Sequence, residues 1–96
     1  MTSQLRIYQI KPGKLDDWVA FWQEYVVPAR AAHGFRVDGA WVTADGEFAW
    51  VVTHDAKDFA VADAAYYAGP ERAAAPHDPM EFIDHAQVRM VRPVGT

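Results

Sequence analysis

The sequence predicts one α+β domain in which strands and helices alternate in the order βαββαβ. Its length of 96 residues fits a single domain that spans 1–96. Residues 14–33 carry apolar side chains at helical spacing, which predicts an amphipathic helix. Asp45-Gly46 separates two segments of alternating character, which is typical of a β-hairpin. Together these observations favour two layers, a sheet and a pair of helices.

A strand and a long helix open the chain. Residues 4–11 contain the strand formers Ile and Tyr, and Pro12-Gly13 ends this segment. The helix over 14–33 has apolar residues three and four apart, so one of its faces is apolar. We expect Pro28 to kink this helix or to end its regular part, because proline lacks the N–H that a regular helix needs. His33-Gly34 is a typical helix end.

The rest of the chain supplies a hairpin, a second helix and a last strand. Residues 35–43 and 47–54 alternate as strands do. Residues 57–68 form an alanine-rich helix, and residues 69–80 are irregular, with one helical turn after Pro70. Residues 81–92 form the last strand before a proline.

The hairpin turn decides which side chains share a face of the sheet. A two-residue turn at Asp45-Gly46 places Trp41 opposite Trp50, on the same face as His54. Right-handed crossovers put both helices on one side of the sheet. The face with smaller side chains suits bulky helix residues, so we expect a second copy of the chain to cover the tryptophan face. The opposite assignment, with the tryptophans beneath the helices, remains open.

Composition excludes several kinds of protein. The net charge is −4 and no Lys/Arg cluster stands out, which argues against a nucleic-acid-binding protein. There is no cysteine, so disulfides and thiolate metal sites are excluded. No apolar run is long enough to cross a membrane, and no signal peptide is recognisable, so we expect a cytoplasmic protein. No metal-ligand spacing such as His-x-x-x-His occurs, and we expect no metal and no cofactor.

Several stretches resemble the NIPSNAP family: LRIYQIKPGKLDDW (5–18), VVPARAAHGFRVDGAW (26–41) and YYAGPE (66–71). The similarity runs from about Gln4 to Val94. The resemblance implies an α+β, ferredoxin-like fold with an antiparallel four-stranded sheet. It also implies a homodimer, the dimeric α/β barrel, whose two sheets enclose a central cavity. Relatives in the wider superfamily include cofactor-independent monooxygenases, lactone isomerases, polyketide cyclases and haem enzymes.

Five polar residues are candidates for chemistry in such a cavity. His54 and His85 can act as general acid or base, because the pKa of histidine lies near working pH. Arg89 can hold an oxyanion, and Tyr8 can donate a hydrogen bond to a ligand. Arg6 shares the face of Tyr8. For each residue a structural role stays open: a bonded strand-end histidine, a solvated edge strand, an interface tyrosine or an ion pair.

The sequence therefore supports two functions. The first is a homodimeric enzyme without a cofactor, of isomerase, cyclase or monooxygenase type. It would act on a lipophilic or aromatic substrate between Trp41 and Trp50 by histidine acid/base chemistry, with residues 69–80 as a lid. The second is a dimeric module that binds a ligand or stabilises a partner without catalysis. Haem binding is a third possibility that depends only on analogy with the superfamily.

Overall fold

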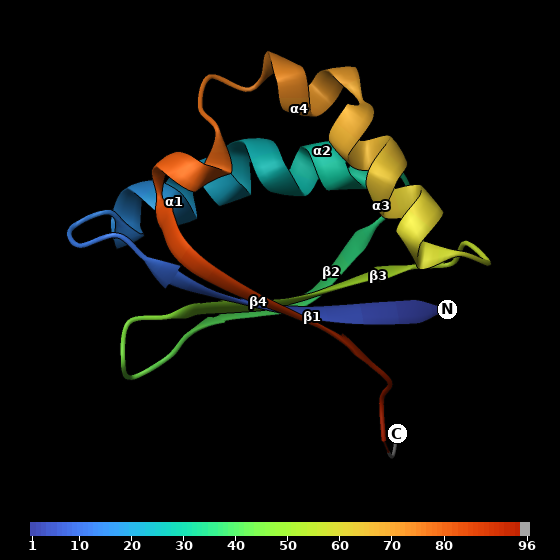
Figure 1. The fold of residues 1–96 in the computed structure, drawn as a ribbon, viewed down its shortest axis with the longest axis horizontal. Helices are drawn as coiled ribbons and strands as arrows, with labels where there is room; N and C mark the ends of the chain where they lie inside the picture. Colours follow the sequence, from blue (N-terminus) through green and yellow to red (C-terminus); the bar gives the residue numbers. More distant parts are fainter. Residues whose placement is uncertain (95–96) are drawn as a thin grey trace.

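A computed structural model describes residues 1–94 and shows a four-stranded sheet with all its helices on one face (Figure 1). Every neighbouring pair of strands is antiparallel, and the strand order is β2-β3-β1-β4. This confirms the predicted α+β, ferredoxin-like fold. The strands are β1 (Thr2–Ile10), β2 (Arg36–Val42), β3 (Phe48–His54) and β4 (Ile83–Val91).

The first of the two helical segments is one continuous helix that changes its pitch. It consists of α1 (Leu15–Phe21), a π-helical segment η1 (Trp22–Val26) and α2 (Val27–Ala32). The Val27 N–H donates to the carbonyl of Trp22, five residues earlier. This wider turn lies directly before Pro28, whose ring would otherwise meet the carbonyl four residues before it. Pro28 therefore follows a local π turn, and the helix continues beyond it to Ala32 instead of ending there.

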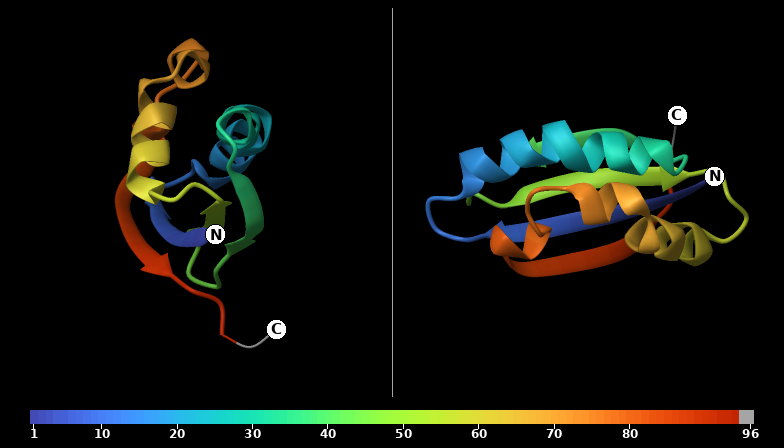
Figure 2. Two further views of the ribbon diagram at one scale, coloured as in Figure 1. Left: turned by 90° about the vertical axis from the view of Figure 1, so that its right-hand side faces the viewer. Right: turned by 90° about the horizontal axis from the view of Figure 1, so that it is seen from above.

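The second helical segment is shorter and ends in a capped turn. It comprises α3 (Phe59–Ala68), α4 (Pro70–Ala74) and the 3₁₀ turn η2 (Pro79–Glu81). Asp58 caps α3 by accepting hydrogen bonds from the N–H groups of Ala60 and Val61, so this helix starts two residues later than predicted. Asp78 and Glu81 form a capping box around η2, and β4 therefore begins after residue 82 rather than at 81. Figure 2 shows both helical segments over the same face of the sheet, where they form one layer.

The hairpin differs from the predicted register by one residue. Thr43 N donates to Glu47 O (2.9 Å) and Gly46 N donates to Thr43 O (3.0 Å), so the loop is the three residues 44–46. Gly46 has a φ of 82°, which suits the last position of such a loop. Trp41 consequently pairs with Ala49, and Ala40 with Trp50. The predicted pairing of Trp41 with Trp50 is wrong, because a one-residue slip moves a side chain to the other face.

The two indoles therefore lie in opposite environments. Trp50 is on the helix side, where it is only 1% exposed and packs edge-on against Trp22 with ring centroids 5.5 Å apart. Trp41 is on the other side, which we call the open face, and is 57% exposed. The arrangement with tryptophan beneath the helices thus holds for Trp50 alone. The helix layer supplies Trp18 and Trp22 against it, so aromatic residues of both layers form the core.

A β-bulge in β2 shifts the register by one more residue near the other end of the hairpin. Val37 pairs with Val52, but Gly39 pairs with Val51, so Asp38 is the extra residue. The hydroxyl of Thr53 donates to Asp38 Oδ2 (2.5 Å), and Arg36 Nε donates to Asp38 Oδ1 (2.9 Å). The bulge thus holds a carboxylate beside a fully buried threonine.

The Asp38 carboxylate makes the stability of the fold depend on pH. The hydrogen bond from Thr53, followed by the one from Arg36, lowers the pKa of Asp38. A folded pKa below the unfolded one stabilises the fold above the ordinary value of about 4, and this stabilisation is lost as the pH falls through the lower folded pKa. Because the carboxylate is exposed, the contribution is below about 1 kcal/mol.

We expect Asp38→Asn to lose less stability than the wild type between about pH 5 and pH 2. Urea denaturation at a series of pH values measures the difference. Parallel acid profiles for the two proteins would contradict the assignment of Asp38.

Candidate functional site

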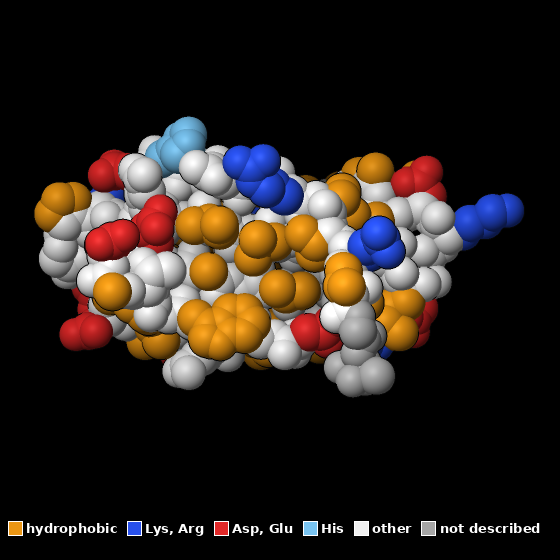
Figure 3. All heavy atoms as spheres, turned by 90° about the horizontal axis from the view of Figure 1, so that it is seen from below, with side chains coloured by type: hydrophobic (Ala, Val, Ile, Leu, Met, Phe, Trp, Pro, Cys, Tyr) orange, Lys and Arg blue, Asp and Glu red, His pale blue; other side chains and the backbone are white. Residues whose placement is uncertain are grey.

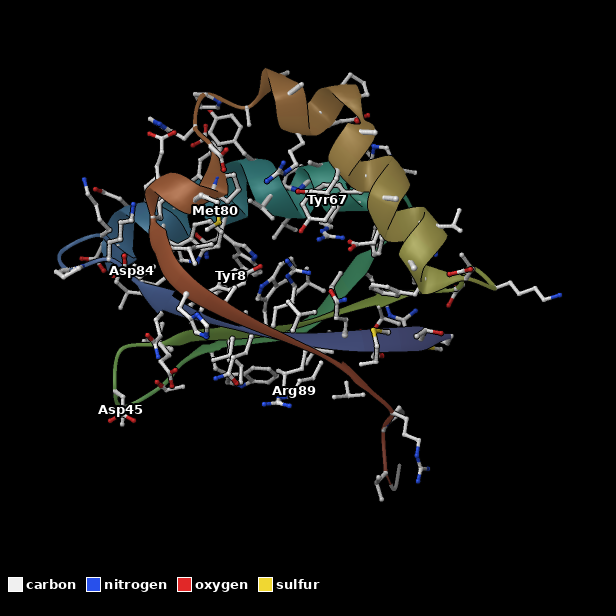
Figure 4. The ribbon with its side chains drawn as sticks, in the orientation of Figure 1. Tyr8, Asp45, Tyr67, Met80, Asp84 and Arg89 are labelled. Atoms are coloured by element: carbon white, nitrogen blue, oxygen red, sulfur yellow. The ribbon has the colours of Figure 1, made fainter. Side chains whose placement is uncertain are left out.

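A small pocket lies between the sheet and the two helical segments, with a cavity volume of about 70 Å³. Its floor is the helix side of β1, β3 and β4, and its walls are residues of the first helix (α1, η1 and α2), of α3 and α4, and of the chain before β4. Figure 4 shows Tyr8, Tyr67 and Met80 directed into the space between the layers. The polar and aromatic residues that line it include Arg6, Tyr8, Trp50, Arg30, Tyr67 and Arg72.

Arg6 lies at the floor of this pocket and organises its hydrogen bonds. Side chains alternate along β1, so Gln4, Arg6 and Tyr8 all face the helices. Arg6 Nε donates to the Tyr8 hydroxyl (2.6 Å) and Nη1 to Gln4 Oε1 (2.6 Å). Its Nη2 donates to the Tyr67 hydroxyl (2.9 Å) and so joins the sheet to α3. These hydrogen bonds hold the guanidinium group in one orientation. The residue is only 9% exposed.

The arginine stays charged in this setting. Burial on its own would lower the pKa of Arg6, but the neighbouring Tyr8 and Tyr67 hydroxyls outweigh that effect and the pKa is raised overall. Burial also raises the pKa of the adjacent Tyr66 phenol. At neutral pH the pocket therefore combines a fixed cation with the protonated phenol of Tyr66.

Two further arginines approach the same tyrosine from the helices. The Arg30 guanidinium lies 5.4 Å from the centre of the Tyr67 ring, and the Arg72 guanidinium lies 4.6 Å from it. Arg30 also stacks on Tyr66 at 3.9 Å and forms an ion pair with Asp63 at 2.6 Å. Cation–π contacts of this kind stabilise a buried guanidinium. Tyr67 is therefore the point where three guanidinium groups meet.

The structure brings three of the predicted site residues together, namely Arg6, Tyr8 and Trp50. His54 is not among the residues that line this pocket. One of its ring nitrogens lies 2.8 Å from the carbonyl of His33, and the other accepts a hydrogen bond from Ala56 N at 2.8 Å. A neutral ring with its proton on Nε2 satisfies both contacts. This geometry matches the alternative of a strand-end histidine bonded to the backbone.

The other predicted residues lie on the open face. His85 and Arg89 of β4 pair with Gln9 and Leu5 of β1, on the side away from the helices, and Trp41 shares that side. Arg89 extends away from the helical layer in Figure 4. The prediction that Trp41, Trp50 and His54 share one face is wrong, because the one-residue slip of the hairpin places Trp50 and His54 on the helix side.

Arg30, Tyr67 and Arg72 also line the pocket, and none of them was predicted as a site residue from the sequence. Arg30 had a usable signal: it follows Trp22 and Val26 at intervals of four, so it lies on the apolar stripe of the first helix. A charged residue in such a stripe indicates a buried interaction. Tyr67 and Arg72 had no comparable signal, because only the folded chain brings α3 and α4 over β1.

Residues 1–94 contain no group of three or more His, Cys, Asp or Glu side chains placed to hold a metal ion. Within the same described range, no helix combines the length and apolar character required to cross a membrane.

Comparison with known proteins identifies the family. The model of the NIPSNAP family matches residues 3–96. The chain belongs to the NIPSNAP family. No curated protein matches this NIPSNAP chain.

Solved structures share the fold of this NIPSNAP chain at low sequence identity. A NIPSNAP domain protein from Burkholderia xenovorans is 19% identical with a TM-score of 0.80, and the match covers 98% of this chain and 95% of that one. A NIPSNAP family protein from Agrobacterium tumefaciens is 18% identical with a TM-score of 0.81, covering 97% and 92%. A putative antibiotic biosynthesis monooxygenase from Bacteriodes thetaiotaomicron is 14% identical with a TM-score of 0.72, covering 97% and 89%. At these identities the likeness shows the fold.

Proposed function

We propose that the protein binds a small lipophilic or aromatic molecule in the pocket between its sheet and its helices. The observation that carries this proposal is the group formed by Arg6, Tyr8 and Tyr67, whose polar ends face an aromatic-lined cavity. A concave site with aromatic walls and a few convergent polar groups is typical of small-molecule binding. The family and the fold shared with a putative antibiotic biosynthesis monooxygenase fit a module of this kind.

Narrowing the pocket tests this proposal. Ala86 lines the cavity from β4, so Ala86→Phe fills its opening without removing any hydrogen bond. We expect this variant to lose at least about tenfold in affinity for any aromatic compound that binds the wild type, since the ring occupies the ligand's volume. Calorimetry with a panel of flat aromatic compounds measures it. Ala60→Phe, on the exposed surface of α3, is the matched control. Equal affinities for the two variants would refute the pocket.

The second candidate function is catalysis without a cofactor, of isomerase, cyclase or monooxygenase type. The distance of 2.6 Å between Arg6 Nε and the Tyr8 hydroxyl favours it, because a guanidinium so placed assists a phenol that hydrogen-bonds a developing oxyanion. Tyr8→Phe should then lower the conversion of a bound compound far more than it lowers binding. Mass spectrometry of the bound panel measures conversion. A ligand that is bound but never altered favours the non-catalytic module.

We further propose that the protein is a homodimer joined through its open face. Figure 3 shows hydrophobic side chains gathered over this face of the sheet, with charged groups at its edges. The apolar residues whose register places them there are Leu5, Ile7, Trp41, Ala49, Val51 and Val91. No helix covers this side in residues 1–94, and a contiguous apolar surface of this kind is typical of an interface.

A charge at the centre of the open face should separate the dimer. Ile7 pairs with Ala49 and Gln87 in the middle of the sheet, so Ile7→Lys would place an ammonium group in the interface, where burial of a charge is unfavourable. We expect light scattering to give twice the 10.8 kDa chain mass for the wild type and the single mass for this variant. Val61→Lys, on the exposed side of α3, should stay dimeric. A monomeric wild type at micromolar concentration would refute the dimer.

A further inference from the structure

We propose that the pocket recognises the carboxylate of a small aromatic or lipophilic acid, which binds between Arg6 and Arg72. This inference rests on the proposed function, and it adds the charge and orientation of the ligand. It follows from the balance of charge in the pocket, from polar atoms left without partners and from the size of the cavity.

The pocket holds more positive than negative charge. Arg6, Arg30 and Arg72 all contact the Tyr67 side chain, yet Asp63 is the carboxylate that accompanies them. Asp63 forms its ion pair with Arg30, although its charge also acts on Arg6. Within the described part of the chain, no ion pair involves Arg6 or Arg72. Buried guanidinium groups are normally paired with an anion, so two positive charges are left for a ligand to neutralise.

Three residues that line the pocket have buried hydrogen-bond donors without a partner. The Nε atoms of Arg30 and Arg72 and the indole Nε1 of Trp50 are buried and have no hydrogen-bond partner among residues 1–94. Arg6, in contrast, already donates to the neutral oxygens of Tyr8, Gln4 and Tyr67. A carboxylate is the better acceptor, because a charged oxygen bonds a guanidinium more strongly than a phenol or an amide does. Donors without acceptors beside an unpaired cation favour an oxyanion as the missing partner.

The dimensions of the cavity set the orientation of the ligand. About 70 Å³ suffices for a carboxylate or a few waters, but it is smaller than an engineered cavity of about 150 Å³ that holds one benzene. The apolar body of the ligand must therefore extend to the mouth. Met80 lines the pocket and is 54% exposed, so it offers an apolar contact near the surface. Val88 is 47% exposed and pairs with Arg6 across β1 and β4, on the helix side of the sheet. The acid group enters first and the apolar end remains near the surface.

Two probes of the same shape test this orientation and charge. 2-Naphthoate and 2-naphthamide differ in charge and little in size, and calorimetry at low ionic strength compares their affinities. We expect the wild type to bind the carboxylate at least about tenfold more tightly, because a hydrogen bond to a charged group is worth that much. Arg72→Met should lose this preference and keep its affinity for the amide. Arg92→Met, which removes an exposed arginine outside the pocket, should keep the preference.

The variant Arg6→Met gives a second test of the preference for the carboxylate probe. Its melting temperature shows whether the variant is folded. A folded Arg6→Met protein that still prefers the carboxylate would overturn the inference. Equal binding of the two probes to the wild type, weakened in both cases by Ala86→Phe, would also overturn it while leaving the proposed pocket intact. Failure of both probes and of the whole aromatic panel would refute the proposed function, and the inference with it.

Discussion

Replacing Trp50 with alanine is expected to lower the free energy of unfolding by about 3–5 kcal/mol, the range for removing a buried aromatic ring. Trp50 is 1% exposed and contacts Tyr8 and Trp22 from both layers, so the truncation leaves a cavity at the centre of the core. Urea or thermal denaturation measures the loss.

Trp41→Ala is the matched control, because it removes the same side chain from the open face. It should cost less than about 1 kcal/mol, as exposed positions do. Both changes are best made in the Ile7→Lys background, where a second copy does not shield the open face. Similar losses at the two positions would contradict the register of the hairpin, which places the indoles on opposite sides of the sheet.

Removing the carboxylate of Asp63 should cost about 3 kcal/mol, near the lower end of the range for breaking a buried ion pair. Arg30 is 2% exposed, and its Nη1 lies 2.6 Å from Asp63 Oδ1. Asp63→Ala leaves this cation among aromatic rings without a neutralising partner. The side chain of Asp63 retains 21% exposure, so water relieves part of the penalty.

The double variant Arg30→Met/Asp63→Leu separates the ion pair from its packing. Two apolar side chains of similar volume need no charge compensation, so the double variant should recover most of the stability lost by Asp63→Ala. A double-mutant cycle from chemical denaturation measures the coupling. A double variant that is no more stable than Asp63→Ala would show that the lost contacts, rather than the unpaired charge, cause the effect.

The sequence predicted the fold because its local signals agree with one another. The helical spacing in 14–33, the Asp45-Gly46 turn and the alternation in the strands all lead to βαββαβ, and the structure has this order. These local signals did not determine the register of the hairpin between β2 and β3. Gly46 adopts a positive φ that suits a loop of two or three residues, so the dipeptide alone does not fix the loop length.

The candidate site was predicted only where strand alternation was enough. Arg6 and Tyr8 are two residues apart on β1, which places them on one face whatever their partners are. Trp50 was assigned to the wrong face, because a single-residue slip of the register places its side chain on the helix side, whereas Trp41 lies on the open face. Tyr67 reaches Arg6 across 61 residues of sequence, and Arg72 joins this group through the Tyr67 ring. The contact between Tyr67 and Arg6 depends on how α3 packs over the sheet.

The π-helical segment before Pro28 also determines which side chains of the first helix reach the pocket. Trp18, Trp22, Val26 and Arg30 follow one another at intervals of four, and all are buried. In a regular α-helix each such step advances by about 40° around the axis, so the last of the four would point roughly 120° away from the first. A turn that contains more residues takes back part of this rotation. The backbone irregularity thus acts as an angular correction, and the direction of a guanidinium group depends on where a proline interrupts the hydrogen bonds of its helix.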